Sequence, residues 1–268
     1  MQDRYAGDLG DFLKLGLLRW LVASSFDAAP HRLGVVWYLA PDESHNADGK
    51  HVAYLDPLSA AGRQLRPLDP DLYDRLAAMV AGGERSVAQL EAFGVLPAGT
   101  RTFGEVLRFG DLPPSGTTAR VERRRSWVCG ALRATEDCSV VFVDPDNGLR
   151  RSDHSIASHR SKSEKHAYLD ELRGFVGRGQ SIVAYHHADR SAKVPVQAER
   201  RMADAAEELG VEPLAAVRAS RGTTRLFLVA PAPAHREHLR GRLQELERSH
   251  WADELVVYWA AGDEMVGS

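Results

Sequence analysis

Apolar and polar residues follow one another in blocks that predict alternating strands and helices. Continuous runs of β-branched, aliphatic and aromatic residues predict strands at 33–39, 140–143, 181–185 and 225–229, while 255–259 is either a last strand or a C-terminal arm. Apolar residues at helical spacing predict helices near 12–22, 72–80, 87–93, 120–134, 168–176, 202–209 and 235–246. This alternation favours a three-layer, Rossmann-like α/β fold with a mainly parallel sheet.

The length of 268 residues suits one large domain, so we predict a single Rossmann-like domain spanning 1–268. Residues 56–110 are amphipathic at helical spacing over much of their length, which predicts a helical insertion within that domain. The stretch 51–55, just before the insertion, predicts a short or edge strand.

The formal net charge of −3 excludes a chain-wide basic signature, so any nucleic acid, RNA included, has to bind through local patches. Two basic stretches stand out, at 120–125 and 150–166. The first is either a phosphate-contacting patch or a solvated helix face, and the second predicts an exposed loop beside the site. A small-molecule substrate agrees equally well with the acidic net charge.

The cysteines and the apolar runs indicate the cellular compartment. Cys129 and Cys138 have no metal-ligand spacing, so we expect reduced thiols in a cytoplasmic protein. No stretch is apolar over a length that spans a bilayer, and the first residues lack the apolar core of a signal peptide. We therefore expect a cytoplasmic protein without membrane contact.

The most apolar predicted strand ends abruptly in a polar turn. Residues 140–143 are followed by Asp144, Pro145, Asp146, Asn147 and Gly148. This sequence is a good turn by itself, because Pro fixes φ and Asn-Gly tolerates positive φ. Ligands of open α/β sheets bind beyond the carboxyl ends of the strands, so Asp144, Asp146 and Asn147 are also the best candidates for chemistry.

Two further polar segments follow predicted strands. His186 and His187 come directly after 181–185, where an imidazole can act as a base, a ligand or a substrate contact. Their spacing matches no recognised metal-binding motif. The loop 40–50, which contains Asp42, is either a ligand-binding loop or a solvated connection.

The N-terminal stretch carries charge at the start of the first predicted helix. Asp8 or Asp11 can cap this helix, because a carboxylate accepts hydrogen bonds from the free N–H groups of the first turn. Gly7 and Gly10 allow close approach of the backbone to a ligand, which favours a binding role instead. Lys14 lies one turn further along the helix.

The segment from Tyr5 to Lys14, YAGDLGDFLK, resembles the N-terminal signature of the bacterial large-subunit rRNA adenine-N6 methyltransferases. In that family an Ala-Gly-Asn segment leads to Asp-Val-Leu-Lys-His. Asp144 and Pro145 fall where the family has its catalytic Asp-Pro-Pro-Tyr motif. The second proline and the tyrosine of that motif are replaced here by Asp146 and Asn147.

The resemblance implies a cofactor and roles for particular residues. The implied cofactor is S-adenosylmethionine, with Lys14 near the carboxylate of the methyl donor and Asp144 accepting a hydrogen bond from the amine to be methylated. The cofactor-binding residues implied in this way, together with the candidate loop after the first strand, are Tyr5, Gly7, Asp8, Asp11, Lys14 and Asp42.

Three hypotheses follow. The first is an S-adenosylmethionine-dependent methyltransferase acting on a nucleic acid or on a small-molecule amine or hydroxyl, with His186 or His187 as general base. The second is a metal-dependent nuclease or phosphohydrolase, in which Asp144 and Asp146 hold Mg²⁺ together with Asp8 or Asp11. The third is a non-catalytic binding protein on the same fold. The sequence specifies neither the acceptor nor the oligomeric state.

Overall fold

The computed structural model describes residues 1–24, 29–42, 49–152, 163–219 and 221–262. Its centre is a seven-stranded sheet in the order β2-β1-β3-β6-β8-β7-β9. Five of these strands run in one direction and β8 and β9 run in the other. The strands are β1 (Leu33–Trp37), β2 (Arg101–Phe103), β3 (Val140–Asp144), β6 (Ser181–His187), β7 (Ala215–Ala219), β8 (Arg225–Ala230) and β9 (Leu255–Trp259).

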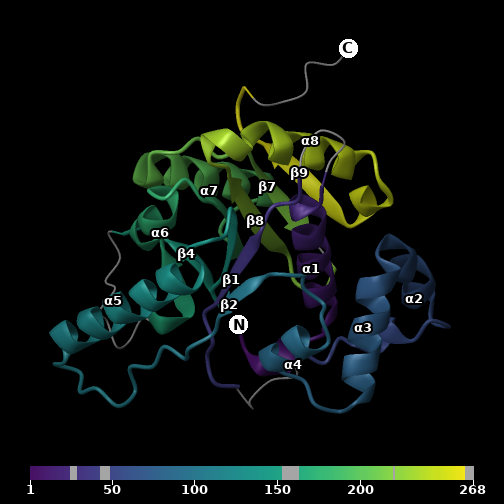
Figure 1. The fold of residues 1–268 in the computed structure, drawn as a ribbon, viewed down its shortest axis with the longest axis horizontal. Coiled ribbons are helices and arrows are strands. Elements are labelled where there is room, and N and C mark those ends of the chain that lie inside the picture. Colours follow the sequence, from purple (N-terminus) through teal and green to yellow (C-terminus); the bar gives the residue numbers. More distant parts are fainter. Residues whose placement is uncertain (25–28, 43–48, 153–162, 220, 263–268) are drawn as a thin grey trace.

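Helices cover both faces of this sheet, so the predicted three-layer α/β architecture is confirmed (Figure 1). One face packs against α1 (Leu9–Val22) and α8 (Arg236–Glu247). The other packs against α5 (Thr117–Ala134), α6 (Leu169–Val176) and α7 (Val194–Leu209). Within the described ranges, no helix combines the length and the apolar character needed to cross a bilayer.

The central strands are apolar throughout because both of their faces are buried. In β3 the side chain of Phe142 packs into the layer that contains α1, while Val141 and Val143 pack into the layer that contains α5. All five residues of β3 are buried. This is the pattern expected of a strand inside a parallel sheet, and it explains why the run could be recognised from the sequence.

The segment 56–110, for which the sequence predicts a helical insertion, contains three α-helices and a strand. It contains α2 (Ala60–Leu65), α3 (Pro70–Ala81) and α4 (Val87–Ala92), which lie between β1 and β2 in the chain. Residues 101–103, in the same segment, form the edge strand β2, which pairs parallel with β1. Residues 51–55 do not form the predicted strand: Ala53–Leu55 is a 3-10 helix with Tyr54 and Leu55 buried. Segments of three to five residues are too short to show a reliable hydrophobic periodicity.

The stretch 150–166 does not form the predicted exposed loop where the structure describes it. Gly148–Arg150 forms β4, and His166–Tyr168 forms β5, which pairs with β4 in a small parallel sheet. Lys165 and His166 are buried. Residues 153–162 lie outside the described residues.

The basic stretch at 120–125 is used largely by the fold and not by a free surface. Arg120 is buried and donates to the carbonyl oxygens of Pro113 and Pro114 at 2.7 and 2.9 Å. Arg123 pairs with Asp111, and the buried Arg124 pairs with Glu171 on α6. The sequence predicted either a phosphate-contacting patch or a solvated helix face. In the structure these arginines instead anchor α5 to neighbouring segments.

Replacement of Arg124 by alanine tests this structural role. The change leaves Glu171 largely buried without its cation, so we expect a loss of about 3–5 kcal/mol in the free energy of unfolding. Arg125, the exposed neighbour on the same helix, is the matched control, and its replacement by alanine should change stability by no more than about 0.5 kcal/mol. Urea denaturation measures both. Equal effects of the two substitutions would contradict the structural role of Arg124.

Candidate functional site

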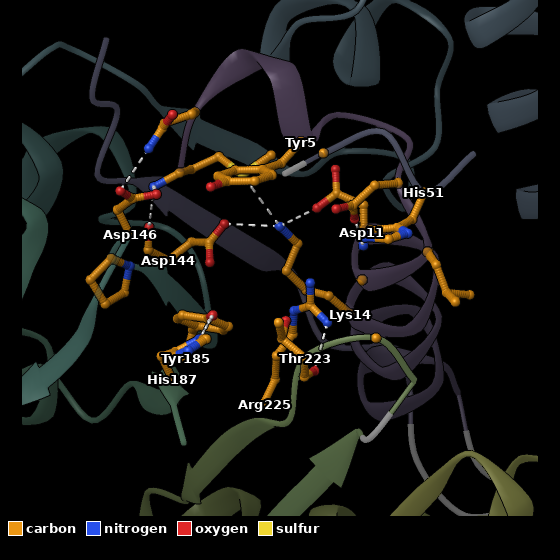
Figure 2. Close-up of a pocket in the computed structure, with 18 of the residues that line it drawn as sticks. Tyr5, Asp11, Lys14, His51, Asp144, Asp146, Tyr185, His187, Thr223 and Arg225 are labelled. Carbon is orange, nitrogen blue, oxygen red and sulfur yellow. Dashed lines mark hydrogen bonds and ion pairs between the residues drawn. The ribbon is translucent and has the colours of Figure 1, made fainter. Parts of the chain in front are cut away.

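A pocket of about 500 Å³ opens at the carboxyl ends of β3 and β6, beside the first turn of α1 (Figure 2). In the sheet, β2 lies next to β1 on one side, and β3, which follows β2 in the chain, lies next to β1 on the other side. Such a reversal of strand order is where open α/β sheets bind ligands. The pocket is lined by Met1, Gln2, Tyr5, Asp8, Leu9, Gly10, Asp11, Lys14, Gly49, His51, Asp144, Pro145, Asp146, Asn147, Tyr185, His187, Arg221, Gly222, Thr223 and Arg225.

A buried lysine joins the two halves of the site. The Nζ atom of Lys14 lies 2.6 Å from an oxygen of Asp11 and 2.9 Å from an oxygen of Asp144. Figure 2 marks both ion pairs with dashed lines. Burial alone lowers the pKa of Lys14, but the two carboxylates outweigh it and raise the pKa. Burial raises the pKa of Asp11 to about 6, against the opposing effect of Lys14. Lys14 is therefore held protonated as a bridge between α1 and β3.

The turn before α1 explains why Asp8 and Asp11 occur at this spacing. Asp8 is the N-cap residue and accepts a hydrogen bond from the backbone N–H of Asp11 at 2.9 Å, as capping predicts. The Asp11 carboxylate accepts in return from the N–H of Gly7 at 3.1 Å. Gly7 has a φ of +78°, and a Cβ there would lie 2.8 Å from the side chain of Met79. Gly7 thus serves the turn and does not line the pocket.

The turn after β3 is held by a second set of hydrogen-bond donors, which includes two cationic groups. The Asp146 carboxylate accepts from the amide of Gln2 at 2.9 Å and from Nζ of Lys165 at 3.0 Å, and it lies 3.8 Å from the amino group of Met1. Burial opposes ionisation of Asp146, but these partners outweigh it and lower its pKa. Asn147 also lines the pocket, and its backbone N–H donates to the carbonyl oxygen of Lys165 at 2.8 Å.

The carboxylate pair does not have the arrangement that the metal hypothesis requires. Asp144 binds Lys14, whereas Asp146 binds Lys165, so each acid already has a cationic partner. Across the part of the chain that the structure describes, no three histidine, cysteine or acidic side chains are grouped so that they can hold a metal ion. The geometry therefore does not favour magnesium at Asp144 and Asp146.

The two candidate histidines differ in position. His187 lines the pocket beside Tyr185, whose hydroxyl lies 3.3 Å from Nδ1 of His187. His186 lies outside the pocket, where its Nδ1 accepts a hydrogen bond from the N–H of Leu149 at 3.2 Å. Burial, with smaller contributions led by Arg201, lowers the pKa of His186 to about 4. The imidazole of His186 thus acts as a neutral structural acceptor.

The predicted donor loop lies largely beyond what the structure describes. Asp42 is exposed, accepts a hydrogen bond from the N–H of Arg4 at 3.1 Å and does not line the pocket. Residues 43–48 lie outside the described residues. Tyr5 does line the pocket, and the guanidinium of Arg4 lies 4.9 Å from the centre of its ring.

Sequence reasoning missed the contribution of the segment before and at the start of β8. Arg221, Thr223 and Arg225 line the pocket because β8 is antiparallel to β6, so its first residue, Arg225, lies opposite His187 at the last position of β6. Knowledge of the strand direction would have shown that the beginning of 225–229 lies at the same edge as the ends of the parallel strands. The sequence alone does not give that direction.

Comparison of the sequence with models of known protein families found no match, and comparison with curated proteins found no significant similarity. The likeness of the N-terminal stretch to the rRNA methyltransferases therefore remains a prediction.

Replacement of Lys14 by methionine tests the buried bridge. The change leaves the carboxylates of Asp11 and Asp144 buried without their shared cation, so we expect a loss of about 3–5 kcal/mol in the free energy of unfolding. Lys50 is exposed, and Lys50→Met is the control that should have little effect. Urea denaturation at neutral pH measures both. A Lys14→Met variant as stable as the control would contradict the bridge.

The low pKa of His186 predicts a pH dependence of stability. The unfolded chain takes up a proton on this histidine below about pH 6.5, whereas the folded protein does so only near pH 4, so stability falls as the pH drops through this window. His186→Asn keeps a hydrogen-bond acceptor and removes the titration. We therefore expect a smaller loss of stability between pH 7 and pH 5 than in the wild type. His187→Asn, at the exposed end of β6, should retain the wild-type dependence, and an unchanged dependence in His186→Asn would contradict the assignment.

Proposed function

We propose that this protein is an S-adenosylmethionine-dependent transferase that methylates an amine or hydroxyl group of a small molecule. The observation that carries the proposal is one pocket that joins the N-terminal stretch from Tyr5 to Lys14 with Asp144 at the end of β3. These are the two segments whose sequences resemble the rRNA methyltransferases. They lie far apart in the chain, and the fold brings them to the edge of the sheet where α/β proteins bind ligands.

The chemistry of the pocket fits the proposed cofactor. S-adenosylmethionine carries an α-amino acid, a positive sulfonium and an adenosine. The pocket offers carboxylates for the positive groups, Arg225 for the carboxylate, and the aromatic rings of Tyr5 and Tyr185 for the base. Its volume of about 500 Å³ also falls within the usual range of small-molecule sites. When bound, the cofactor would supply an electrophilic methyl group.

The side chains at the end of β3 and β6 provide the groups that a methyl acceptor needs. One oxygen of Asp144 is held by Lys14, which fixes the carboxylate at the pocket wall, where it can accept a hydrogen bond from an amine or hydroxyl. His187, which lines the same pocket, is the group that would take the proton from the acceptor. His186 is excluded from this role by its bond to the backbone of Leu149.

The use of the basic residues favours a small acceptor over a nucleic acid. Arg120, Arg123 and Arg124 are bound to groups of the protein itself. Arg151, in the other basic stretch, pairs with Asp204 and Glu207 on α7. Recognition of a nucleic-acid backbone requires cations that are open to phosphates, whereas these arginines already bind carbonyl oxygens or carboxylates of the protein.

Calorimetric titration tests the proposal directly. S-adenosylmethionine and its demethylated product, S-adenosylhomocysteine, are titrated into the full chain, and binding in the micromolar range is expected. Each ligand at 100 times its dissociation constant should also stabilise the fold by about 2.7 kcal/mol, which appears as a rise in melting temperature. Magnesium chloride alone is the control and should give no such rise. Stabilisation by magnesium without binding of either nucleoside would reject the transferase and favour the metal-dependent hydrolase.

A further inference from the structure

Most of the acidic and basic side chains that line the pocket have an oppositely charged partner, either in the pocket or next to it. Lys14 is shared by Asp11 and Asp144, and Asp146 binds Lys165. Arg221 pairs with Glu254 outside the pocket. Asp8 and Arg225 remain: within the described residues, neither has an oppositely charged side chain at ion-pair distance. The pocket thus contains one acid, Asp8, and one base, Arg225, whose charges no described side chain neutralises.

Both residues line the pocket and lie at the first turn of α1. A Cβ atom at Gly10 would lie only 2.3 Å from the guanidinium carbon of Arg225, so this guanidinium packs against the first turn of α1. Asp8 caps that turn through one carboxylate oxygen. The Nη1 atom of Arg225 donates to the carbonyl oxygen of Thr223 at 2.9 Å, which fixes the side chain in the orientation shown in Figure 2.

Opposite charges that are separated and unpaired in one pocket match a ligand that carries both signs. We propose that Arg225 and Asp8 bind an α-amino acid group, with Arg225 on its carboxylate and Asp8 on its ammonium. This inference rests on the proposed function, because the amino acid in question is that of the methyl donor. A free α-amino acid has the same chemistry, and the experiment below separates the two sources.

The assignment replaces the role that the family resemblance implies for Lys14. The charge of Lys14 is already balanced by two carboxylates at 2.6 and 2.9 Å, so Lys14 would bind a third carboxylate, that of the ligand, only weakly. The planar guanidinium of Arg225 can instead bind a carboxylate through two parallel hydrogen bonds. Glycine at position 10 leaves room for that guanidinium, because a Cβ there would displace it.

The experiment compares S-adenosylhomocysteine with S-adenosyl-3-thiopropylamine, which has the same amine and nucleoside but lacks the carboxylate. Affinities are measured by calorimetry for the wild type and for Arg225→Gln. Loss of a charge-assisted hydrogen bond should weaken binding of S-adenosylhomocysteine about 10- to 100-fold and leave the decarboxylated ligand unaffected. The discrimination that the wild type shows between the two ligands should therefore disappear in the variant.

Two further variants give distinct signatures. Asp8→Asn keeps an N-cap side chain and removes the charge, so it should weaken both ligands, since both carry the amine. Gly10→Ala favours helix formation but displaces the guanidinium, so it should reproduce the selective loss of Arg225→Gln. Equal effects of Arg225→Gln on the two ligands, or an Asp8→Asn variant with wild-type affinity for both, would overturn the assignment.

The same titrations distinguish a failure of the amino acid site from a failure of the proposed transferase function. Suppose the wild type bound neither nucleoside but bound L-methionine in a manner that depended on Arg225. This result would support the amino acid site and contradict the proposed transferase function. If the wild type bound S-adenosylhomocysteine with no dependence on Arg225 or Asp8, the result would support the proposed transferase function and contradict the amino acid site. A wild type that bound none of the three ligands would overturn both.

Discussion

The site depends on a buried ammonium group held between two buried carboxylates. Lys14 on α1 links Asp11 on the same helix to Asp144 at the end of β3, and all three side chains are nearly inaccessible to water. Burial of three charges is unfavourable unless each is compensated, so the positions of helix and strand depend on one another. This constraint fixes the wall of the pocket before any ligand enters, which is the condition for precise positioning of a reacting group.

The fold was largely predictable because its central strands bury both faces. The apolar runs that form β1, β3, β6 and β8 were recognised from the sequence, and the cap at Asp8 followed from residue type. β2 and β7 were missed for a physical reason. β2 has three residues, and β7 is rich in alanine, a residue with little preference for strands. Both acquire their structure by pairing with neighbouring strands.

The site was predictable in part, because polar residues at strand ends gather at one edge of a parallel sheet. This reasoning found Asp144, Asp146, Asn147 and His187, all of which line the pocket. It could not separate His187 from His186, since adjacent residues of a strand point to opposite faces and the sequence does not say which face is open. It also missed Arg225, which reaches the site only because β8 runs against its neighbour.

The antiparallel course of β8 makes the pocket a product of the whole chain. The proposed amino acid site takes Asp8 from near one end of the sequence and Arg225 from near the other, and neither half holds both charges. Contacts of such long sequence separation form late and slowly in folding. Ligand affinity in this protein would therefore report completion of the entire sheet, and a ligand would in turn protect the C-terminal strands from opening.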